Sequence, residues 1–254
     1  MSAQEWGVSP YRQVLEVRSG IFMLNKTLVP QSVAREIQAM IQNGTLKAGE
    51  KIPSQRGFSQ TLGVSRASLR EALLTLETLG LLKTEAGRGT FVAAATEGAH
   101  GASGHMAPWR YSDSYSVFDV FQTRILLEGE IARLSAGRLT QLQLDRMEAA
   151  TQTMEECWAR QDLISNVEAD LAFHGTIVSA CSNAMLKALY QTVRDQVTET
   201  QRQPIPITDP ERMRHSIAEH RRIIAALRNN DAAAARSEME AHIRNTARCA
   251  GLSP

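Results

Sequence analysis

The chain has 254 residues and a formal net charge of +1, with 43% hydrophobic and 22% charged residues. This length is sufficient for two domains, and the composition is that of an ordinary globular protein, which excludes disordered and fibrous classes. No apolar run reaches the roughly 18 residues of a membrane-spanning helix, and we expect neither a secretory signal nor a membrane partner. The three cysteines are scattered and form no paired motif, which predicts a reducing, cytoplasmic location.

The N-terminal third of the chain is basic. Residues 1–25 show no clear periodicity, and we predict a separate N-terminal arm there. A domain is expected over residues 26–92, beginning with a short helix over 31–42, where apolar residues recur at helical spacing. Nine Lys and Arg residues and five Asp and Glu residues lie between Lys26 and Val92, an excess of four positive charges. Such a domain suits a polyanionic partner.

Residues 52–92 have the pattern of a winged helix-turn-helix. Ser54 and Ser65 can each cap a helix, and Gly63 between them permits a tight turn. Glycines at positions 87 and 89 suit the tip of a β-hairpin. The expected elements are helices over 55–62 and 66–78, followed by strands over 81–83 and 90–92.

A helix-turn-helix binds the major groove of DNA with the first residues of its second helix. Arginine can bond guanine edges with two parallel hydrogen bonds, and serine reaches bases or phosphates. Each arginine taken alone could simply lie on a solvated helix face. The combination of three arginines on a helix-turn-helix with a glycine-flanked wing instead favours binding to an operator in double-stranded DNA. The predicted DNA-binding residues are Arg56, Ser65, Arg66, Ser68, Arg70 and, in the wing, Arg88.

The rest of the chain is predicted to be helical. Residues 93–115 are rich in Gly, Ala and Ser and are expected to form a linker. From residue 116 onward no strand-like alternation appears, and residues 116–250 predict an all-α bundle of six or seven helices. The whole protein is therefore expected to be mainly α. The expected helices cover 116–137, 140–160, 162–181, 184–201, 209–228 and 231–249.

Four ionisable side chains fall on the apolar faces of the C-terminal helices. Asp170 and His174 lie one turn apart on one helix, while His220 and His242 lie on two others. Burying four such groups separately is costly, although a single core histidine is often satisfied by ordinary hydrogen bonds. A shared divalent cation removes the cost, and the set predicts a metal site, with zinc first and nickel, manganese or iron as alternatives.

Arg124 also falls on a face that should point inward. A buried guanidinium needs an anion. Glu128, one turn further along, can supply it, and the carboxylate of a small organic acid effector is the second interpretation. Asn183, at a predicted helix break, is expected to add a hydrogen bond to that effector.

The N-terminal domain resembles the GntR family of regulators over residues 27–92. The similar segments are GEKIPSQR at 49–56, LGVSR at 62–66, LREAL at 69–73 and GRGTFV at 87–92. Two residues depart from the family pattern. Gln55 replaces a usual Glu, and Ala67 replaces a usual Thr or Asn in the recognition helix, which changes the expected base preference.

The C-terminal domain resembles the FCD ligand-binding domain of the FadR subfamily over residues 117–249. The resemblance implies that an Asp and three His hold a divalent metal, that the metal helps to bind a small carboxylate, and that the protein is a homodimer. The similar motifs are Arg124-x-x-x-Glu128, Asp170-x-x-Phe173-His174, Ser182-Asn183, Glu219-His220-x-x-Ile223 and Met239-x-x-His242.

These observations predict a transcriptional regulator, not an enzyme, whose operator binding responds to a carboxylate effector at the metal site. A repressor is the preferred interpretation, and an activator stays open. Two alternatives stay open. One is a metalloenzyme that uses the Asp/His site, for which Glu128 is the obvious general base. The other is a constitutive DNA-binding protein with a structural metal. The sequence does not identify the effector, the operator or the metal.

Overall fold

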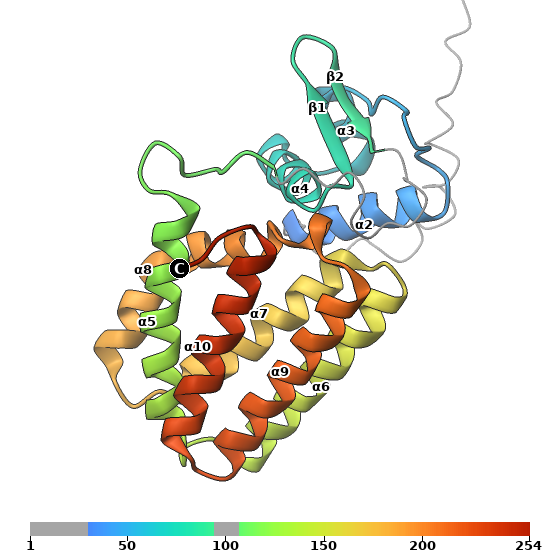
Figure 1. The fold of residues 1–254 in the computed structure, drawn as a ribbon. Coiled ribbons are helices and arrows are strands. Elements are labelled where there is room, and N and C mark those ends of the chain that lie inside the picture. Colours follow the sequence, from blue (N-terminus) through green and yellow to red (C-terminus); the bar gives the residue numbers. More distant parts are fainter. Residues whose placement is uncertain (1–29, 94–106) are drawn as a thin grey trace, which may run out of the picture. The chain divides into compact units, whose positions relative to one another are not determined.

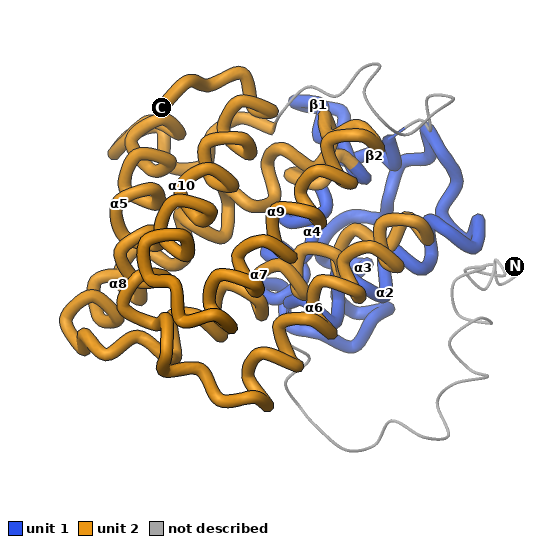
Figure 2. Tube along the Cα trace, turned by 60° about the horizontal axis from the view of Figure 1, so that its bottom comes forward, with its two compact units in different colours: residues 1–77, 81–94 blue, residues 78–80, 95–254 orange. Residues whose placement is uncertain are grey.

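The computed structural model describes residues 30–93 and 107–254. The chain divides into two compact units, residues 1–77 with 81–94 and residues 78–80 with 95–254 (Figure 2). The predicted arm, residues 1–25, and residues 94–106 of the predicted linker lie outside the described residues. None of the helices in the described ranges is long and apolar enough to cross a membrane.

The segment from Pro30 to Ala93 has the predicted helix-turn-helix and wing. Ser54 caps the first helix of the motif by accepting a hydrogen bond from the backbone N–H of Gly57, and Gly63 ends it in the left-handed region at φ +67°. The two strands pair antiparallel with Leu82 opposite Val92, and they extend closer to the turn than predicted. The elements are α2 (Pro30–Gln42), α3 (Gln55–Leu62), α4 (Arg66–Thr78), β1 (Leu82–Glu85) and β2 (Gly89–Val92) (Figure 1).

The apolar faces of these three helices form one small core. Ile37 of α2, Phe58 of α3, and Leu69 and Leu76 of α4 are fully buried in it. Each such side chain contributes about 1.5–3 kcal/mol of transfer free energy when it is buried. The core therefore fixes α4, and with it the direction of the exposed recognition residues.

The second unit is an all-α bundle. Between residues 107 and 254 the structure has six long α-helices and one 3₁₀ turn, and each helix begins and ends within two residues of its prediction. In the bundle α5 packs against α10 and α8, and α6 packs against α7 and α9 (Figure 1). The elements are α5 (Val117–Ser135), α6 (Gln141–Ala159), α7 (Leu163–Ala180), α8 (Ala184–Arg202), η1 (Ile205–Ile207), α9 (Pro210–Arg228) and α10 (Ala232–Cys249).

The last residues of the predicted linker are folded. Trp109 packs edge-on against Tyr111 at 5.4 Å and donates its indole N–H to the backbone oxygen of Tyr115 at 2.7 Å. Gln203, just after α8, donates to the backbone oxygen of Ala107 at 3.0 Å. The last part of the predicted linker, residues 107–115, therefore contains local aromatic contacts and one hydrogen bond to the residue that follows α8.

Candidate functional site

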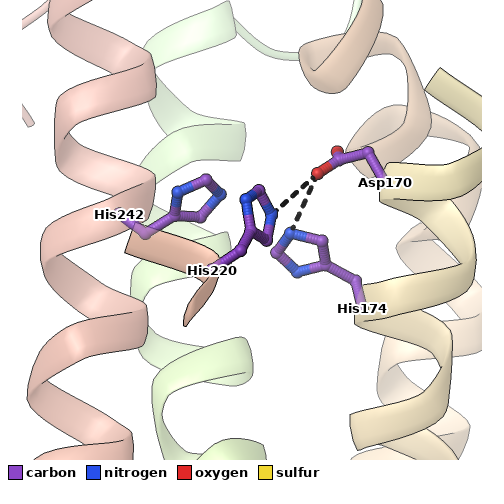
Figure 3. A group of neighbouring side chains, drawn as sticks. All are labelled: Asp170, His174, His220 and His242. Atoms are coloured by element: carbon purple, nitrogen blue, oxygen red, sulfur yellow. Dashed lines mark hydrogen bonds and ion pairs between the residues drawn. The ribbon is translucent and has the colours of Figure 1, made fainter. Parts of the chain in front are cut away.

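The structure brings together the four predicted metal ligands. Asp170 and His174 come from α7, His220 from α9 and His242 from α10, and one ligand atom from each lies within 4.8 Å of all the others (Figure 3). The three imidazole rings are buried, and the Asp170 side chain is 19% exposed. Helix α7 therefore contributes two polar side chains to the cluster, and α9 and α10 contribute one each.

The contacts inside this cluster call for a cation. Nε2 of His220 lies 3.0 Å from Oδ1 of Asp170, and Nε2 of His174 lies 3.7 Å from the same oxygen (Figure 3). Nδ1 of His220 faces the backbone oxygen of Ser216 at 2.8 Å, so Nδ1 carries the proton of a neutral ring. The Nε2 lone pair then faces a carboxylate oxygen, and this arrangement is favourable only with a proton or a metal ion between the two atoms.

His174 shows the same requirement. Its Nδ1 lies 2.6 Å from Oε2 of Glu128. Its buried Nε2 has no hydrogen-bond partner among the described residues, and the nearest carboxylate oxygen, Oδ1 of Asp170, lies 3.7 Å away. An unpartnered polar atom in a buried site is costly. Coordination of a metal ion by Nε2 would satisfy this atom.

One carboxylate supports the metal cluster from α5. Glu128 accepts a hydrogen bond from Nε of Arg124 at 2.6 Å, and Nη1 of Arg124 donates to Thr200 at 3.2 Å. Burial alone would raise the pKa of Glu128, but the neighbouring Arg124 and His174 outweigh it and lower this pKa to about 2. Glu128 is therefore an anion with two close partners, Arg124 and the predicted metal ligand His174.

A second carboxylate supports the cluster from α9. Glu219 accepts hydrogen bonds from Nδ1 of His242 at 2.8 Å, from Arg212 at 2.9 and 2.8 Å, and from Asn245 at 2.8 Å. Burial alone would raise the pKa of Glu219, but His242 and Arg212 lower it to about 2. Burial and the neighbouring His220 lower the pKa of His242 to about 4, so this ring is neutral near pH 7. With Nδ1 bonded to Glu219, Nε2 of His242 is the remaining ligand atom.

These residues fit a divalent metal ion. Three imidazoles and one carboxylate are a donor set that zinc and its neighbours accept. Ligating histidines are normally held by a hydrogen bond from their second nitrogen to a carboxylate or backbone oxygen. His220 and His242 meet this condition with Ser216 and Glu219, and His174 lies beside Glu128.

A small cavity opens next to the cluster. It has a volume of about 60 Å³, and its wall includes Asp170, His242, the buried Arg124 and the half-buried Arg212. Gln201 also lines it and donates to Oδ2 of Asp170 at 2.8 Å. Burial alone would lower the pKa of Arg124, but the charge of Glu128 raises it above its usual range. The cavity therefore offers two permanent cations and amide donors to a small anion.

Sequence reasoning placed Asn183 at this cavity, and the structure places it elsewhere. Its side-chain oxygen accepts hydrogen bonds from the backbone N–H groups of Met185 and Leu186, which makes it the N-cap of α8. It does not line the cavity. The residue does lie at the predicted helix break, and capping explains its presence there.

The six predicted DNA-binding residues lie at the surface of the winged helix-turn-helix. Arg66 and Arg70 are exposed on the first turns of α4, and Arg56 is exposed on α3. Ser65 caps α4 by accepting from the backbone N–H of Ser68 at 3.0 Å, and the two hydroxyls bond each other at 2.9 Å. This surface presents three guanidinium groups and two hydroxyls around the start of a helix, as major-groove binding requires.

The wing residue Arg88 is exposed at the hairpin turn. Its side chain pairs with Glu85 and lies over the ring of Phe91, with 5.6 Å between the guanidinium carbon and the ring centroid. Its side chain is 72% exposed. Arg88 is therefore presented at the tip of the wing, where a phosphate would compete with Glu85 for it.

Family models match both halves of the chain. Residues 119–245 match the FCD domain, and residues 30–92 match the bacterial regulatory proteins of the gntR family. The chain is 31% identical to the HTH-type transcriptional regulator LutR of Bacillus subtilis over 81% of this chain and 94% of that protein. It is 30% identical to the Uxu operon transcriptional regulator of Escherichia coli over 83% of this chain and 84% of that protein.

A solved structure shares the fold. The crystal structure of a putative GntR transcriptional regulator from Rhodococcus sp. RHA1 superposes with a TM-score of 0.50 at 21% identity, covering 89% of this chain and 99% of that one. These relatives are transcriptional regulators and not enzymes.

Proposed function

Because the chain belongs to the GntR family of transcriptional regulators and carries an FCD domain, we propose that a small carboxylate effector, bound beside a divalent metal ion in this domain, controls its binding to an operator. We further propose that the protein is a repressor that the effector releases from DNA. Asp170, His174, His220 and His242 would hold the metal ion, which would supply a positive charge and open coordination positions to the effector.

One observation carries this proposal: four ligand atoms converge within 4.8 Å beside a cavity that two arginines line. The two arginines and the three carboxylates Asp170, Glu128 and Glu219 leave one negative charge in excess, which would repel a carboxylate. A divalent metal ion changes this excess to one positive charge. The effector is therefore expected to bind only to the metal-loaded protein, with Arg124 as a further partner.

The cavity volume limits the size of the effector. One water molecule needs a cavity volume of about 10–15 Å³. A cavity of about 60 Å³ therefore holds the equivalent of a few waters. This size suits short-chain carboxylic and hydroxycarboxylic acids, and a long-chain acyl group would need the cavity to enlarge.

We also propose that the protein is a homodimer that presents two recognition helices to a near-palindromic operator. Large apolar side chains are exposed on two helices that pack side by side, Leu126 on α5 and Met185 and Leu189 on α8. Their exposed fractions are 67%, 69% and 44%. Met185 and Leu189 lie one helical turn apart on α8. Exposed apolar side chains that gather on one surface are typical of association surfaces, and a second copy would cover them.

The test is a titration on a selected operator. The purified protein selects its sites from a random DNA library, and its affinity for the selected site is measured by fluorescence anisotropy with Zn²⁺ present or removed by a chelator. We expect a two- to four-carbon acid to weaken binding with Zn²⁺ and to have no effect without it. Unchanged affinity across the acid panel would contradict effector control and leave a constitutive DNA-binding protein with a structural metal.

A further inference from the structure

A second, larger pocket lies on the part of the bundle formed by α9 and α10. It has a volume of about 550 Å³ and is lined by residues that include Arg212, His215, Arg222, Arg248 and Cys249. His215, Arg222 and Arg248 are exposed. We call it the outer pocket, and the small cavity beside the metal cluster the inner cavity.

The outer pocket is cationic. Its lining contains three guanidinium groups and one carboxylate, that of Glu219. Arg222 bonds Glu238 through Nε at 2.8 Å, and Arg248 bonds the neutral Asn245 through Nη1 at 2.6 Å. A guanidinium has five N–H donors. Both exposed arginines therefore keep donors for an incoming anion.

Two residues line both the outer pocket and the inner cavity, namely Arg212 and Cys249. The wall between the two spaces therefore includes one flexible ion-paired side chain and one thiol. The carboxylate that holds Arg212 in this wall is Glu219, and the same carboxylate bonds the metal ligand His242. Moving Arg212 toward the outer pocket would thus open the wall at a position next to the metal centre.

We propose that the outer pocket is a second anion-binding site and the entrance to the inner cavity, with Arg212 as its gate. Arg222 and Arg248 attract a small organic anion. Its carboxylate then competes with Glu219 for the guanidinium of Arg212 and draws this side chain toward the outer pocket, which opens the wall and lets the anion pass into the inner cavity. Cations of the same size are excluded by charge. The entrance role depends on the proposed function of the inner cavity, whereas the cationic character of the outer pocket does not.

The thiol of Cys249 allows a test without any effector. The other two cysteines are buried. The full-length protein is labelled with a methanethiosulfonate reagent that carries either a sulfonate or a trimethylammonium group, and the two rates at Cys249 are compared by mass spectrometry. A Cys249→Ser variant gives the background. We expect the anionic reagent to react faster.

Paired variants identify the source of this preference. Arg222→Ala with Arg248→Ala is expected to lower the ratio of anionic to cationic labelling rates by about tenfold, the scale of electrostatic steering by local charges. The matched control is Arg221→Ala with Arg228→Ala, which removes two charges from α9 outside the outer pocket. An equal ratio in wild type and in the pocket variant would overturn the anion site.

A second measurement tests the entrance. L-lactate is mixed with the Co²⁺-loaded protein, and the change in the visible spectrum of the metal is followed by stopped flow. Labelling Cys249 with the sulfonate reagent should slow this change at least tenfold, while the Cys249→Ser protein treated in the same way should not be affected. Equal rates for the labelled and unlabelled protein would overturn the entrance. A panel of acids that leaves the Co²⁺ spectrum unchanged would overturn the proposed function instead, because the labelling ratio is measured without an acid.

Discussion

Replacing Glu219 with Gln should weaken metal binding even though Glu219 is not a ligand. The Glu219 side chain is 4% exposed, and its two oxygens accept hydrogen bonds from His242, Arg212 and Asn245. Glutamine keeps one oxygen and replaces the other with an NH₂ group. If the oxygen stays on His242, the NH₂ group faces the donors of Arg212 and Asn245. If it turns, a donor faces Nδ1 of His242, and the ring loses its orientation.

The expected magnitude follows from these contacts. Loss of a partner that orients a metal-bound histidine typically costs 10–100-fold in metal affinity. Hydrogen bonds to charged groups contribute about 1.5–3 kcal/mol each, so the metal-free Glu219→Gln protein should also lose about 2–3 kcal/mol of unfolding free energy. Metal affinity should therefore fall by about 1.4–2.7 kcal/mol, which is the same 10–100-fold loss expressed as free energy.

The assay is a Zn²⁺ competition titration against a chromophoric chelator, together with urea unfolding of the metal-free protein. Glu240→Gln is the matched control, because Glu240 also bonds two arginines, Arg236 and Arg244, but lies outside the metal cluster. The control should bind Zn²⁺ like wild type. A folded Glu219→Gln protein with wild-type Zn²⁺ affinity would refute the reasoning, because it would show that Glu219 does not position His242.

Three further predictions concern pH, DNA and association. The pKa of His242 is lowered from 6.5 to about 4, so the unfolded state takes up a proton on this ring at a higher pH than the folded state does. The metal-free protein should therefore lose about 3 kcal/mol of unfolding free energy between pH 6.5 and 4. In urea titrations, the unfolding free energy of His242→Gln should fall less over the same pH range. Arg66→Ala or Arg70→Ala should each cost roughly 1–3 kcal/mol of operator binding and relax base preference, whereas an unchanged footprint and affinity would contradict the recognition surface. Leu126→Asp with Leu189→Asp should yield monomers in analytical ultracentrifugation, and an intact dimer would place the interface elsewhere.

Local patterns were sufficient to predict the helices and the wing. The roles of Ser54 as a helix cap and of Gly63 as a turn residue could be predicted from the adjacent sequence, because a cap and a left-handed turn depend on only a few neighbouring backbone groups. The gathering of the four candidate metal ligands was predictable for a related reason. Asp170, His174, His220 and His242 occur where helical periodicity requires apolar residues, and an ionisable group at such a position needs partners. Periodicity places each residue on its face, although it does not give the distances between helices.

Sequence reasoning listed Glu219 only as part of a family motif and gave it no role in the site, and it did not name Arg212. Arg212 precedes Glu219 by seven residues, two helical turns, and a charged pair at this spacing on α9 resembles many solvated helix faces. Only the packing of α10 against α9 shows that Glu219 is buried and bonded to His242. Asn183 shows the opposite error, because the same amide can cap a helix or bind a ligand, and local sequence cannot distinguish the two.

Glu128 and Glu219 are placed in the same way, because each lies between an arginine and a histidine of the cluster. On one side Arg124 pairs with Glu128, which lies against His174, and on the other Arg212 pairs with Glu219, which bonds a second metal ligand. Both arginines line the inner cavity. Under the proposed function, an effector carboxylate that bonds either arginine would withdraw it from its glutamate. The freed negative charge would then act on the neighbouring imidazole and strengthen it as a metal ligand. Effector and metal should therefore increase each other's affinity by equal factors, as linkage requires, and the inner cavity should hold its metal ion most tightly when an acid occupies it.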